Sequence, residues 1–178
     1  KKELLDQTKN LNHEFLASEI PYTMNPGGPN HEELACLSGV TDYYETLYSH
    51  HFTEQKLNLH EKGKKVFELI YNHEEALIKT LIEFLKLKKN VRLIGKTSHS
   101  RSERMPTVSF TVKDKSSLEI AKAAGENQIG IRNGEFYAWR CLKGLGIEPN
   151  DGVVRVSMVH YNNIEEVNRL IEFLDTIL

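Results

Sequence analysis

The apolar residues between positions 62 and 88 recur every three or four residues. They are Val66, Leu69, Ile70, Leu77, Leu81 and Phe84, with His73 filling the gap between Ile70 and Leu77. This spacing predicts a single amphipathic helix, which at a rise of 1.5 Å per residue would extend about 40 Å. A helix this long often bridges two structural units, so we expect a domain boundary within it or at its end.

The residues after this helix alternate short strand patterns with short helix patterns. Alternation is clearest at 107–112, where Val108, Phe110 and Val112 would face a core. The other predicted strands are 91–94, 129–132 and 153–159, and the predicted helices are 116–125, 136–145 and 163 to the C-terminus. This order predicts an α+β fold, with a small, mostly antiparallel sheet covered by helices on one side and preceded by the long bridging helix.

The first 30 residues contain several prolines and the paired glycines at positions 27 and 28, which break any regular period. We therefore expect an extended connection there. Asn30 is placed to cap a helix whose first turn contains Glu32 and Glu33. Because a helix N-terminus favours anions, the segment around Asn30 has a physical reason to bind a phosphate.

Arg155 lies in the middle of the predicted strand 153–159. Alternation places Val154, Val156 and Met158 on one face and Arg155 on the other, less apolar face. A guanidinium held there by rigid backbone could grip a carboxylate through two parallel hydrogen bonds. Alternatively, the side chain covers the sheet with its methylene stem and keeps its charge in water. The strand alone leaves both interpretations open.

Composition limits the classes of partner. The 178 residues carry a formal charge of -2 with a pI near 6.5, which gives no reason to expect nucleic acid or an anionic membrane as partner. No apolar run approaches the roughly 18 residues of a membrane-spanning helix. Cys36 and Cys141 lie far apart without a secretory signal, which predicts free, buried thiols and a cytoplasmic protein. The eight histidines lack ligand spacing such as His-Glu-x-x-His, so we expect no metal site.

Four segments resemble, in their order, the C-terminal part of class V aminotransferases, the cysteine desulfurase-like branch of the fold-type I pyridoxal 5′-phosphate (PLP) enzymes. They are GGPNHE at 27–32, RMPTVSF at 104–110, IGIRNGEFYA at 129–138 and VRVSMVHYN at 154–162. The complete enzymes of this family have an α/β fold. The resemblance implies a C-terminal remnant of the large PLP-binding domain at 1–60, a bridging helix at 61–90 and a small C-terminal domain at 91–178.

The resemblance also implies roles for individual residues. Arg155 matches the strand arginine that binds the α-carboxylate of the amino-acid substrate. Gly28, Asn30 and His31 match a loop that contacts the PLP phosphate of the partner subunit in a homodimer. The family carries a threonine where this chain has Gly28, so backbone N–H groups would have to make that contact.

Tyr137 falls about where cysteine desulfurases carry their nucleophilic cysteine, so persulfide chemistry is not expected. The preceding residues 132–134 read as a tight turn, which would let Tyr137 reach the mouth of an active site and contact the substrate. A tyrosine in the core is the alternative. The family's Schiff-base lysine lies tens of residues before the glycine-rich loop, and Lys1, Lys2 and Lys9 are too close to that loop to match it.

Two functions follow as hypotheses. The first is the C-terminal fragment of a PLP-dependent, homodimeric enzyme that acts on an amino acid by amino transfer or by elimination, with the fragment inactive alone. The second is a non-catalytic α+β binding or protein-interaction module derived from the same fold.

Overall fold

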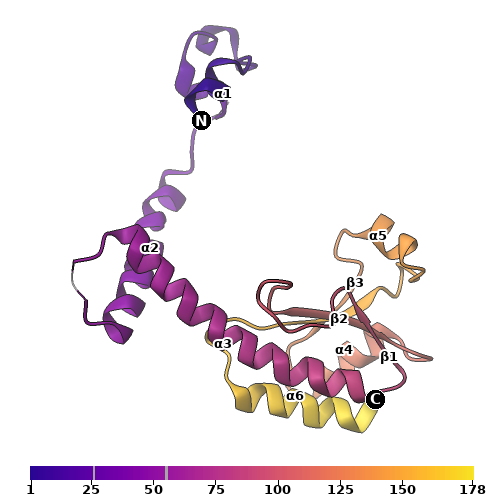
Figure 1. Cartoon of the computed structure of the whole chain (residues 1–178). Coiled ribbons are helices and arrows are strands. Elements are labelled where there is room, and N and C mark those ends of the chain that lie inside the picture. The colour runs from indigo at the N-terminus through magenta and orange to yellow at the C-terminus, as the bar shows by residue number, and fades with distance from the viewer. Residues whose placement is uncertain (26, 55) are drawn as a thin grey trace. The chain divides into compact units, whose positions relative to one another are not determined.

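The long amphipathic pattern forms helix α3, Leu59–Leu87, in the computed structural model, which confirms the predicted long helix (Figure 1). The structure describes residues 1–25, 27–54 and 56–178. It divides into two compact units, Lys1–Gly63 and Lys64–Leu178, so the boundary falls inside α3.

The first unit contains short helices where we expected only an extended connection. Helix α1, Lys2–Asp6, is followed by the 3-10 turns Glu14–Leu16 and Ile20–Thr23. The side-chain amide of Asn10 donates to the carbonyls of Leu16 and Ala17, and such contacts hold a short segment folded without a regular period. Helix α2, His31–His51, begins as predicted, because Asn30 Oδ1 accepts from the backbone N–H of Glu33 at 3.1 Å.

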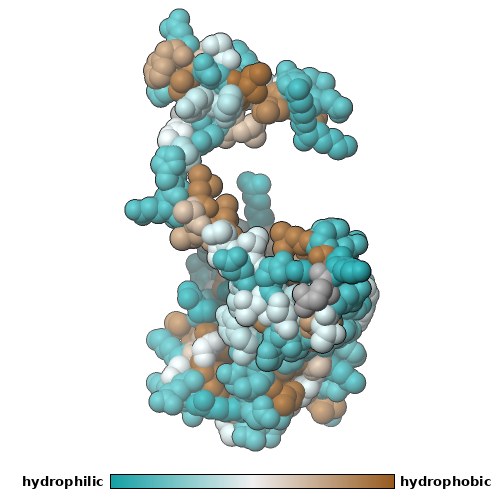
Figure 2. Space-filling model, turned by 90° about the vertical axis from the view of Figure 1, so that its left-hand side faces the viewer, coloured by the Kyte–Doolittle hydropathy of each residue, from teal (hydrophilic) through white to brown (hydrophobic). Residues whose placement is uncertain are grey.

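The first unit has almost no core of its own. Among its described residues only Tyr48 is buried. Large apolar side chains lie at its surface instead, and Figure 2 shows hydrophobic residues exposed there. They include Leu4, Leu11, Phe15, Ile20, Met24, Leu34, Leu37 and Val40. Many large apolar side chains therefore remain exposed in a unit that has almost no core.

The second unit is built on a four-stranded sheet in the order β1-β2-β4-β3. Its strands are β1 (Val91–Ile94), β2 (Thr107–Val112), β3 (Arg132–Gly134) and β4 (Val153–Ser157). Every neighbouring pair is antiparallel, with Ser109 opposite Arg155 and Arg132 also opposite Arg155. With the helices that cover it, this sheet confirms the predicted α+β fold class.

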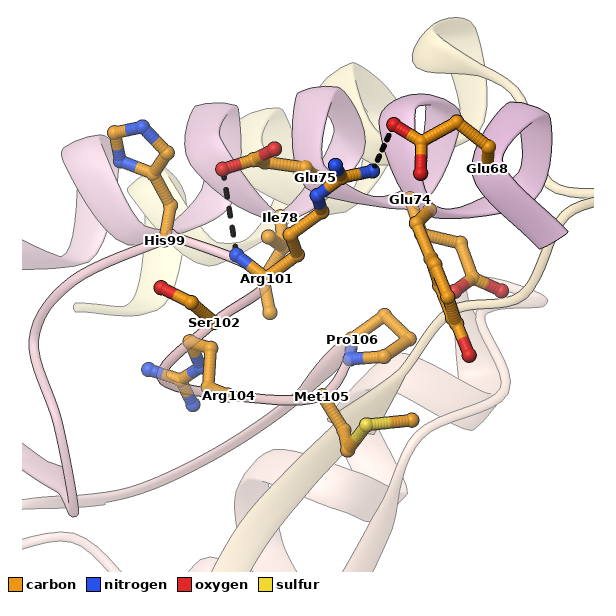
Figure 3. A pocket seen from close by; sticks show the side chains of 11 residues that line it. Glu68, Glu74, Glu75, Ile78, His99, Arg101, Ser102, Arg104, Met105 and Pro106 are labelled. Atoms are coloured by element: carbon orange, nitrogen blue, oxygen red, sulfur yellow. Dashed lines mark hydrogen bonds and ion pairs between the residues drawn. The ribbon is translucent and has the colours of Figure 1, made fainter. Parts of the chain in front are cut away.

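The segment between β1 and β2 lies along α3 (Figure 3). Arg101 fastens it, since its Nη1 lies 2.7 Å from Glu68 Oε1 and its backbone N–H donates to Glu75 Oε1 at 3.3 Å. Arg104 donates from Nη1 to the carbonyl of Lys96 and from Nη2 to the carbonyl of Thr107. The ion pair is exposed and therefore contributes little stability, whereas the contacts of Arg104 close the base of the segment.

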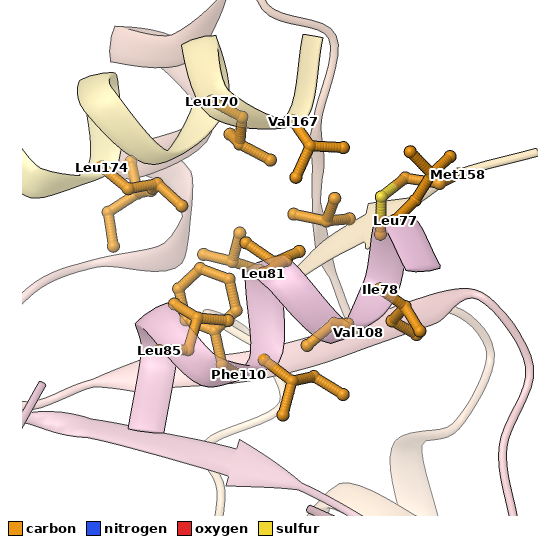
Figure 4. Close-up of a cluster of buried hydrophobic side chains, with 14 of the residues drawn as sticks. Leu77, Ile78, Leu81, Leu85, Val108, Phe110, Met158, Val167, Leu170 and Leu174 are labelled. Carbon is orange, nitrogen blue, oxygen red and sulfur yellow. The ribbon is translucent and has the colours of Figure 1, made fainter. Parts of the chain in front are cut away.

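The main core lies between the sheet and helices α3 and α6 (Figure 4). Leu81 of α3, Phe110 of β2, Val154 of β4 and Leu174 of α6 are fully buried in it. Helix α4, Ser117–Glu126, adds Ile120 to this core, and its Ala124 is also fully buried. Burying a side chain of this size stabilises the fold by about 1.5–3 kcal/mol.

The predicted helix starts at Ser116 and Asn163 are confirmed. Ser116 Oγ accepts from the N–H of Leu118 at the start of α4. Helix α6, Ile164–Ile177, opens with a capping box in which Asn163 and Glu166 each accept from the other's backbone N–H. A cap of this kind stabilises a helix by about 1 kcal/mol.

Three predictions around residue 132 are wrong. Residues 129–131 are not a strand, because pairing with β4 begins only at Arg132. Residues 132–134 are therefore strand β3 rather than a tight turn. Helix α5 spans only Trp139–Gly144, because Phe136 and Tyr137 have φ of 49° and 59°, which a right-handed helix does not allow.

The end of β3 and the residue before β4 approach each other closely at Gly134 and Gly152. Gly152 has φ of 70°, and a Cβ there would overlap the backbone C and O atoms of Gly134. Asp151 anchors the same corner, since its Oδ1 accepts from Ser116 Oγ at 2.7 Å and from the N–H of Ser117 at 3.0 Å. Together these contacts tie the start of β4 to β3 and to the N-terminus of α4.

None of the described helices combines the length and the apolar composition needed to cross a membrane. Cys36 and Cys141 are free, as expected, but both are exposed, so the prediction of buried thiols is wrong. Each lies on the outward face of its helix, where the side chain has no core to pack against.

We predict that Gly152→Ala lowers the free energy of unfolding by about 3 kcal/mol, because the methyl group meets the Gly134 backbone at a φ that favours glycine. Urea unfolding followed by circular dichroism measures the change. Gly125→Ala is the matched control: it lies in α4 with nothing near its Cβ, so it should leave stability unchanged or raise it by up to about 1 kcal/mol. Equal effects of the two substitutions would contradict the close approach.

Candidate functional site

Strand β4 presents Arg155 on the face of the sheet opposite the main core. Val154 and Val156 point into the core between the sheet and α3, and alternation turns Arg155 the other way. Val153, on the same face as Arg155, packs with Leu142 and Ile147 in a second small cluster that includes α5. The main core therefore decides which way the arginine points.

Arg155 is half-buried, and its guanidinium stacks on an aromatic ring. Its Cζ lies 4.0 Å from the centroid of the Phe136 ring, a cation–π contact. Its Nε is buried and, within the described chain, has no hydrogen-bond partner. A guanidinium that merely extended into water would be neither stacked nor partly desolvated. The contact with Phe136 instead holds the planar group of Arg155 in one orientation.

The ring of Phe136 is presented by a strained turn at residues 135–138. The N–H of Ala138 donates to the carbonyl of Glu135 at 2.8 Å, and both central residues have positive φ. That combination is typical of a type I′ turn, which normally uses Asn-Gly rather than Phe-Tyr. A bulky residue with positive φ costs about 1–3 kcal/mol and such residues gather at functional sites.

Tyr137 lies at the tip of this turn and is fully exposed, at 102% of its reference area. The alternative of a tyrosine in the core is therefore wrong. The turn brings Phe136 onto Arg155, but no described contact joins Tyr137 to Arg155. A role for Tyr137 in substrate binding stays a prediction.

Sequence analysis missed Arg132. It is the first residue of β3 and lies directly opposite Arg155 in the β3–β4 pair, so both side chains stand on the same face. Taking 132–134 for a turn concealed this pairing. Three residues, 132–134, are too short a segment to predict as a strand from the sequence. Only the register between β3 and β4 shows that Arg132 lies opposite Arg155.

The three residues predicted to bind the cofactor all lie in the first unit. Gly28 is exposed, Asn30 is the N-cap of α2, and His31 is its first residue. Nothing lies within 4 Å of a Cβ built on Gly28, so packing does not require glycine there. Arg155 and Tyr137 lie in the second unit.

Gly28, Asn30 and His31 could provide one contact to PLP but do not form a complete pocket for it. The open backbone at Gly28 and the start of α2 could offer N–H groups to a phosphate. Asn30 Oδ1 is already engaged by the N–H of Glu33, however, and the carboxylates of Glu32 and Glu33 oppose an anion in the first turn. The backbone, rather than the Asn30 side chain, is thus the part suited to a phosphate.

A cavity of about 420 Å³ opens between α3 and the segment 99–106 (Figure 3). Glu74 of α3 lines it and is 8% exposed. Burial raises the pKa of the Glu74 carboxyl above its ordinary value of 4.5, while His160 and His73 act in the opposite direction and offset part of that effect. None of the predicted site residues lines this cavity.

A family comparison matches residues 63–170 to the family described as "Aminotransferase class-V". The chain is 40% identical over 119 residues to the aminotransferase-like protein FGM3 of Gibberella zeae, covering 66% of this chain and 30% of that protein. It is 35% identical over 181 residues to the cysteine desulfurase-like protein ustD of Aspergillus flavus, covering 85% of this chain and 40% of that protein. The chain thus spans well under half the length of these relatives.

Solved structures show the same fold. A cysteine desulfurase from Thermococcus onnurineus superposes with a TM-score of 0.56 at 25% identity, covering 67% of this chain and 29% of that one. The cysteine desulfurase CsdA of Escherichia coli superposes with a TM-score of 0.63 at 17% identity, covering 88% and 32%. These matches likewise cover only about a third of each solved chain.

We predict that Tyr137→Gly raises the free energy of unfolding by up to about 1 kcal/mol, because glycine adopts a φ near 59° without steric cost. Thermal or urea unfolding measures the change. Tyr161→Gly is the control, since Tyr161 is also exposed but its φ is not positive; it should be neutral or destabilising. A loss of stability in Tyr137→Gly as large as in the control would show that the turn is not strained.

We also predict that Glu74→Gln raises the melting temperature at pH 7. A carboxyl whose pKa is raised on folding binds its proton more tightly in the folded state, so its contribution to stability falls as pH rises above about 4.5 and stays low above the raised pKa. Glutamine does not titrate, so its advantage should shrink as pH is lowered toward 4.5. Calorimetry across this range tests it. Glu172→Gln, at an exposed site on α6, should show no such pH-dependent difference.

Proposed function

The chain belongs to the class-V aminotransferase family, and we propose that it is the substrate-carboxylate-binding, C-terminal part of a PLP-dependent enzyme that acts on an amino acid. The observation that carries this proposal is the environment of Arg155. The arginine is fixed on a rigid strand, stacked on Phe136 and without a carboxylate partner among the described side chains.

Arg155 would hold the substrate by its α-carboxylate. The planar fork of a guanidinium matches the two oxygens of a carboxylate, and the Phe136 ring under it leaves the outer N–H groups to set the direction of approach. Tyr137, at the tip of the turn, would lie beside the bound amino acid. Holding the carboxylate in one orientation fixes which bond at Cα is presented to the cofactor.

PLP, when bound, supplies an electron sink for negative charge at the substrate's Cα. This chain would contribute the carboxylate grip and, from the loop at 27–31, N–H groups for the PLP phosphate of the partner subunit in a homodimer. Gly28, Asn30 and His31 are the positions that match the family's loop. With tyrosine where cysteine desulfurases carry their cysteine, amino transfer or elimination fits these residues better than persulfide formation.

We further propose that residues 1–60 are the end of a larger cofactor-binding domain, that 61–90 bridge, and that 91–178 form the small domain. The exposed apolar side chains of the first unit and its near lack of a core support this assignment, because such a segment needs a partner to bury its surface. Free, unpaired Cys36 and Cys141 support a reducing, cytoplasmic setting.

The second hypothesis, a non-catalytic binding or interaction module, has two observations in its favour. Gly28 replaces the threonine of the family loop, and the side chain of Asn30 is engaged in capping α2. Both features weaken a cofactor contact, and neither lies in the second unit. Carboxylate recognition by Arg155 separates the two hypotheses, since a module of this second kind has no need of it.

We predict that Arg155→Lys in the complete enzyme raises KM for its amino-acid substrate at least about tenfold, because lysine keeps the charge but lacks the fork. PLP loading, followed by its visible absorbance, should stay unchanged. Arg92→Lys is the matched control: Arg92 lies on the same face of the sheet, but its Nη2 donates to the carbonyl of Leu145. Unchanged kinetics in Arg155→Lys would refute the carboxylate role and favour the non-catalytic module.

A further inference from the structure

The pairing of Arg132 with Arg155 is unfavourable for the fold. The two residues are directly opposite across the β3–β4 pair, where Cβ atoms lie about 4.5–5.5 Å apart. Like charges at such positions repel and destabilise a sheet. Arg132 is exposed and Arg155 is half-buried, so solvent screens the repulsion only in part.

Neither guanidinium has a polar partner among the residues that the structure describes, apart from solvent. Four of the other five arginines do: Arg101 pairs with Glu68, and Arg92, Arg104 and Arg169 donate to backbone carbonyls. Arg140 shows no such partner within the described ranges, but no second cation lies opposite it in a strand pair. No acidic side chain within the described ranges forms an ion pair with Arg132 or Arg155. Two adjacent cations are thus left without a counter-charge in a chain that carries 25 acidic residues.

Charge balance indicates what completes this site. One α-carboxylate neutralises one guanidinium, and the fork of Arg155 can occupy both of its oxygens. Arg132 would then remain an unbalanced cation beside it. A ligand with a second carboxylate, a short distance from the first, would neutralise both arginines and turn the cross-strand repulsion into a favourable contact.

We propose that the substrate is an acidic amino acid, whose α-carboxylate binds Arg155 and whose side-chain carboxylate binds Arg132. This inference rests on the proposed function, which supplies the carboxylate-binding role of Arg155. The short separation across one strand pair suits a short side chain. Arg132 is then a specificity-determining residue that selects for the second negative charge.

The test compares two ligands of nearly equal size, succinate and monomethyl succinate, which differ by one negative charge. Binding to the 178-residue chain is measured by NMR titration, with spectra that also report whether each variant is folded. We expect succinate to bind at least about tenfold more tightly than its monoester, as one additional charge-assisted contact implies. Arg132→Gln should abolish this preference by weakening succinate alone.

The control for overall charge is Lys122→Gln, an exposed position on α4, whose Ile120 packs in the core on the other face of the sheet. It should leave the preference for succinate intact.

The remaining outcomes separate the two proposals. If Arg155→Lys weakens both ligands but the wild-type chain binds them equally, the acidic-substrate inference fails and the carboxylate role of Arg155 stands. If Arg132→Gln weakens both ligands to the same extent, the two arginines share one carboxylate and the inference also fails. If Arg155→Lys changes neither affinity, or the folded wild-type chain binds neither ligand, both proposals are overturned.

Discussion

The burial of one face of β2 and β4 under helices α3 and α6 is the constraint on which the rest of the second unit depends. Val108, Phe110, Val154 and Val156 are all buried in that layer. Because side chains alternate along a strand, burying these residues forces Arg155 onto the opposite face. A slip of register by one residue would bury the guanidinium and expose the valines. The burial of the valines therefore fixes the register and, with it, the face on which Arg155 lies.

Around Arg155 the chain departs from local preferences at several neighbouring positions, whereas the other non-glycine residues with positive φ, Asp114 and Gln128, are isolated from each other. Two bulky residues, Phe136 and Tyr137, occupy a turn that favours asparagine and glycine, and two arginines face each other across a strand pair. Elsewhere helices α2, α4 and α6 begin at well-formed caps, and the arginines outside this face that contact the protein donate to carbonyls or carboxylates. Departures that cluster at one place, against an otherwise consistent background, are characteristic of a functional site.

The two units of the chain differ in how much hydrophobic core they contain. The second unit encloses its own core and contains the matched family region from position 64 onward. The first unit exposes leucines and aromatic residues over most of its length, and its single buried tyrosine cannot organise a core. The proposed carboxylate site at Arg155 therefore lies within the unit that has its own core, whereas the loop at 27–31 lies in the unit that lacks one.

Local patterns in the sequence determined the long helix, the strands at 91–94 and 107–112, the caps at Asn30, Ser116 and Asn163, and the orientation of Arg155, because each depends on periodicity or on a cap within a few residues. The order of its motifs also determined the family. Tertiary structure decided the rest: where β3 begins, the partnership of Arg132 with Arg155, and the stacking of Phe136. These depend on register between strands that are separated by a long connection in the sequence, and on a backbone conformation that side-chain preferences disfavour. Neither is written in local sequence.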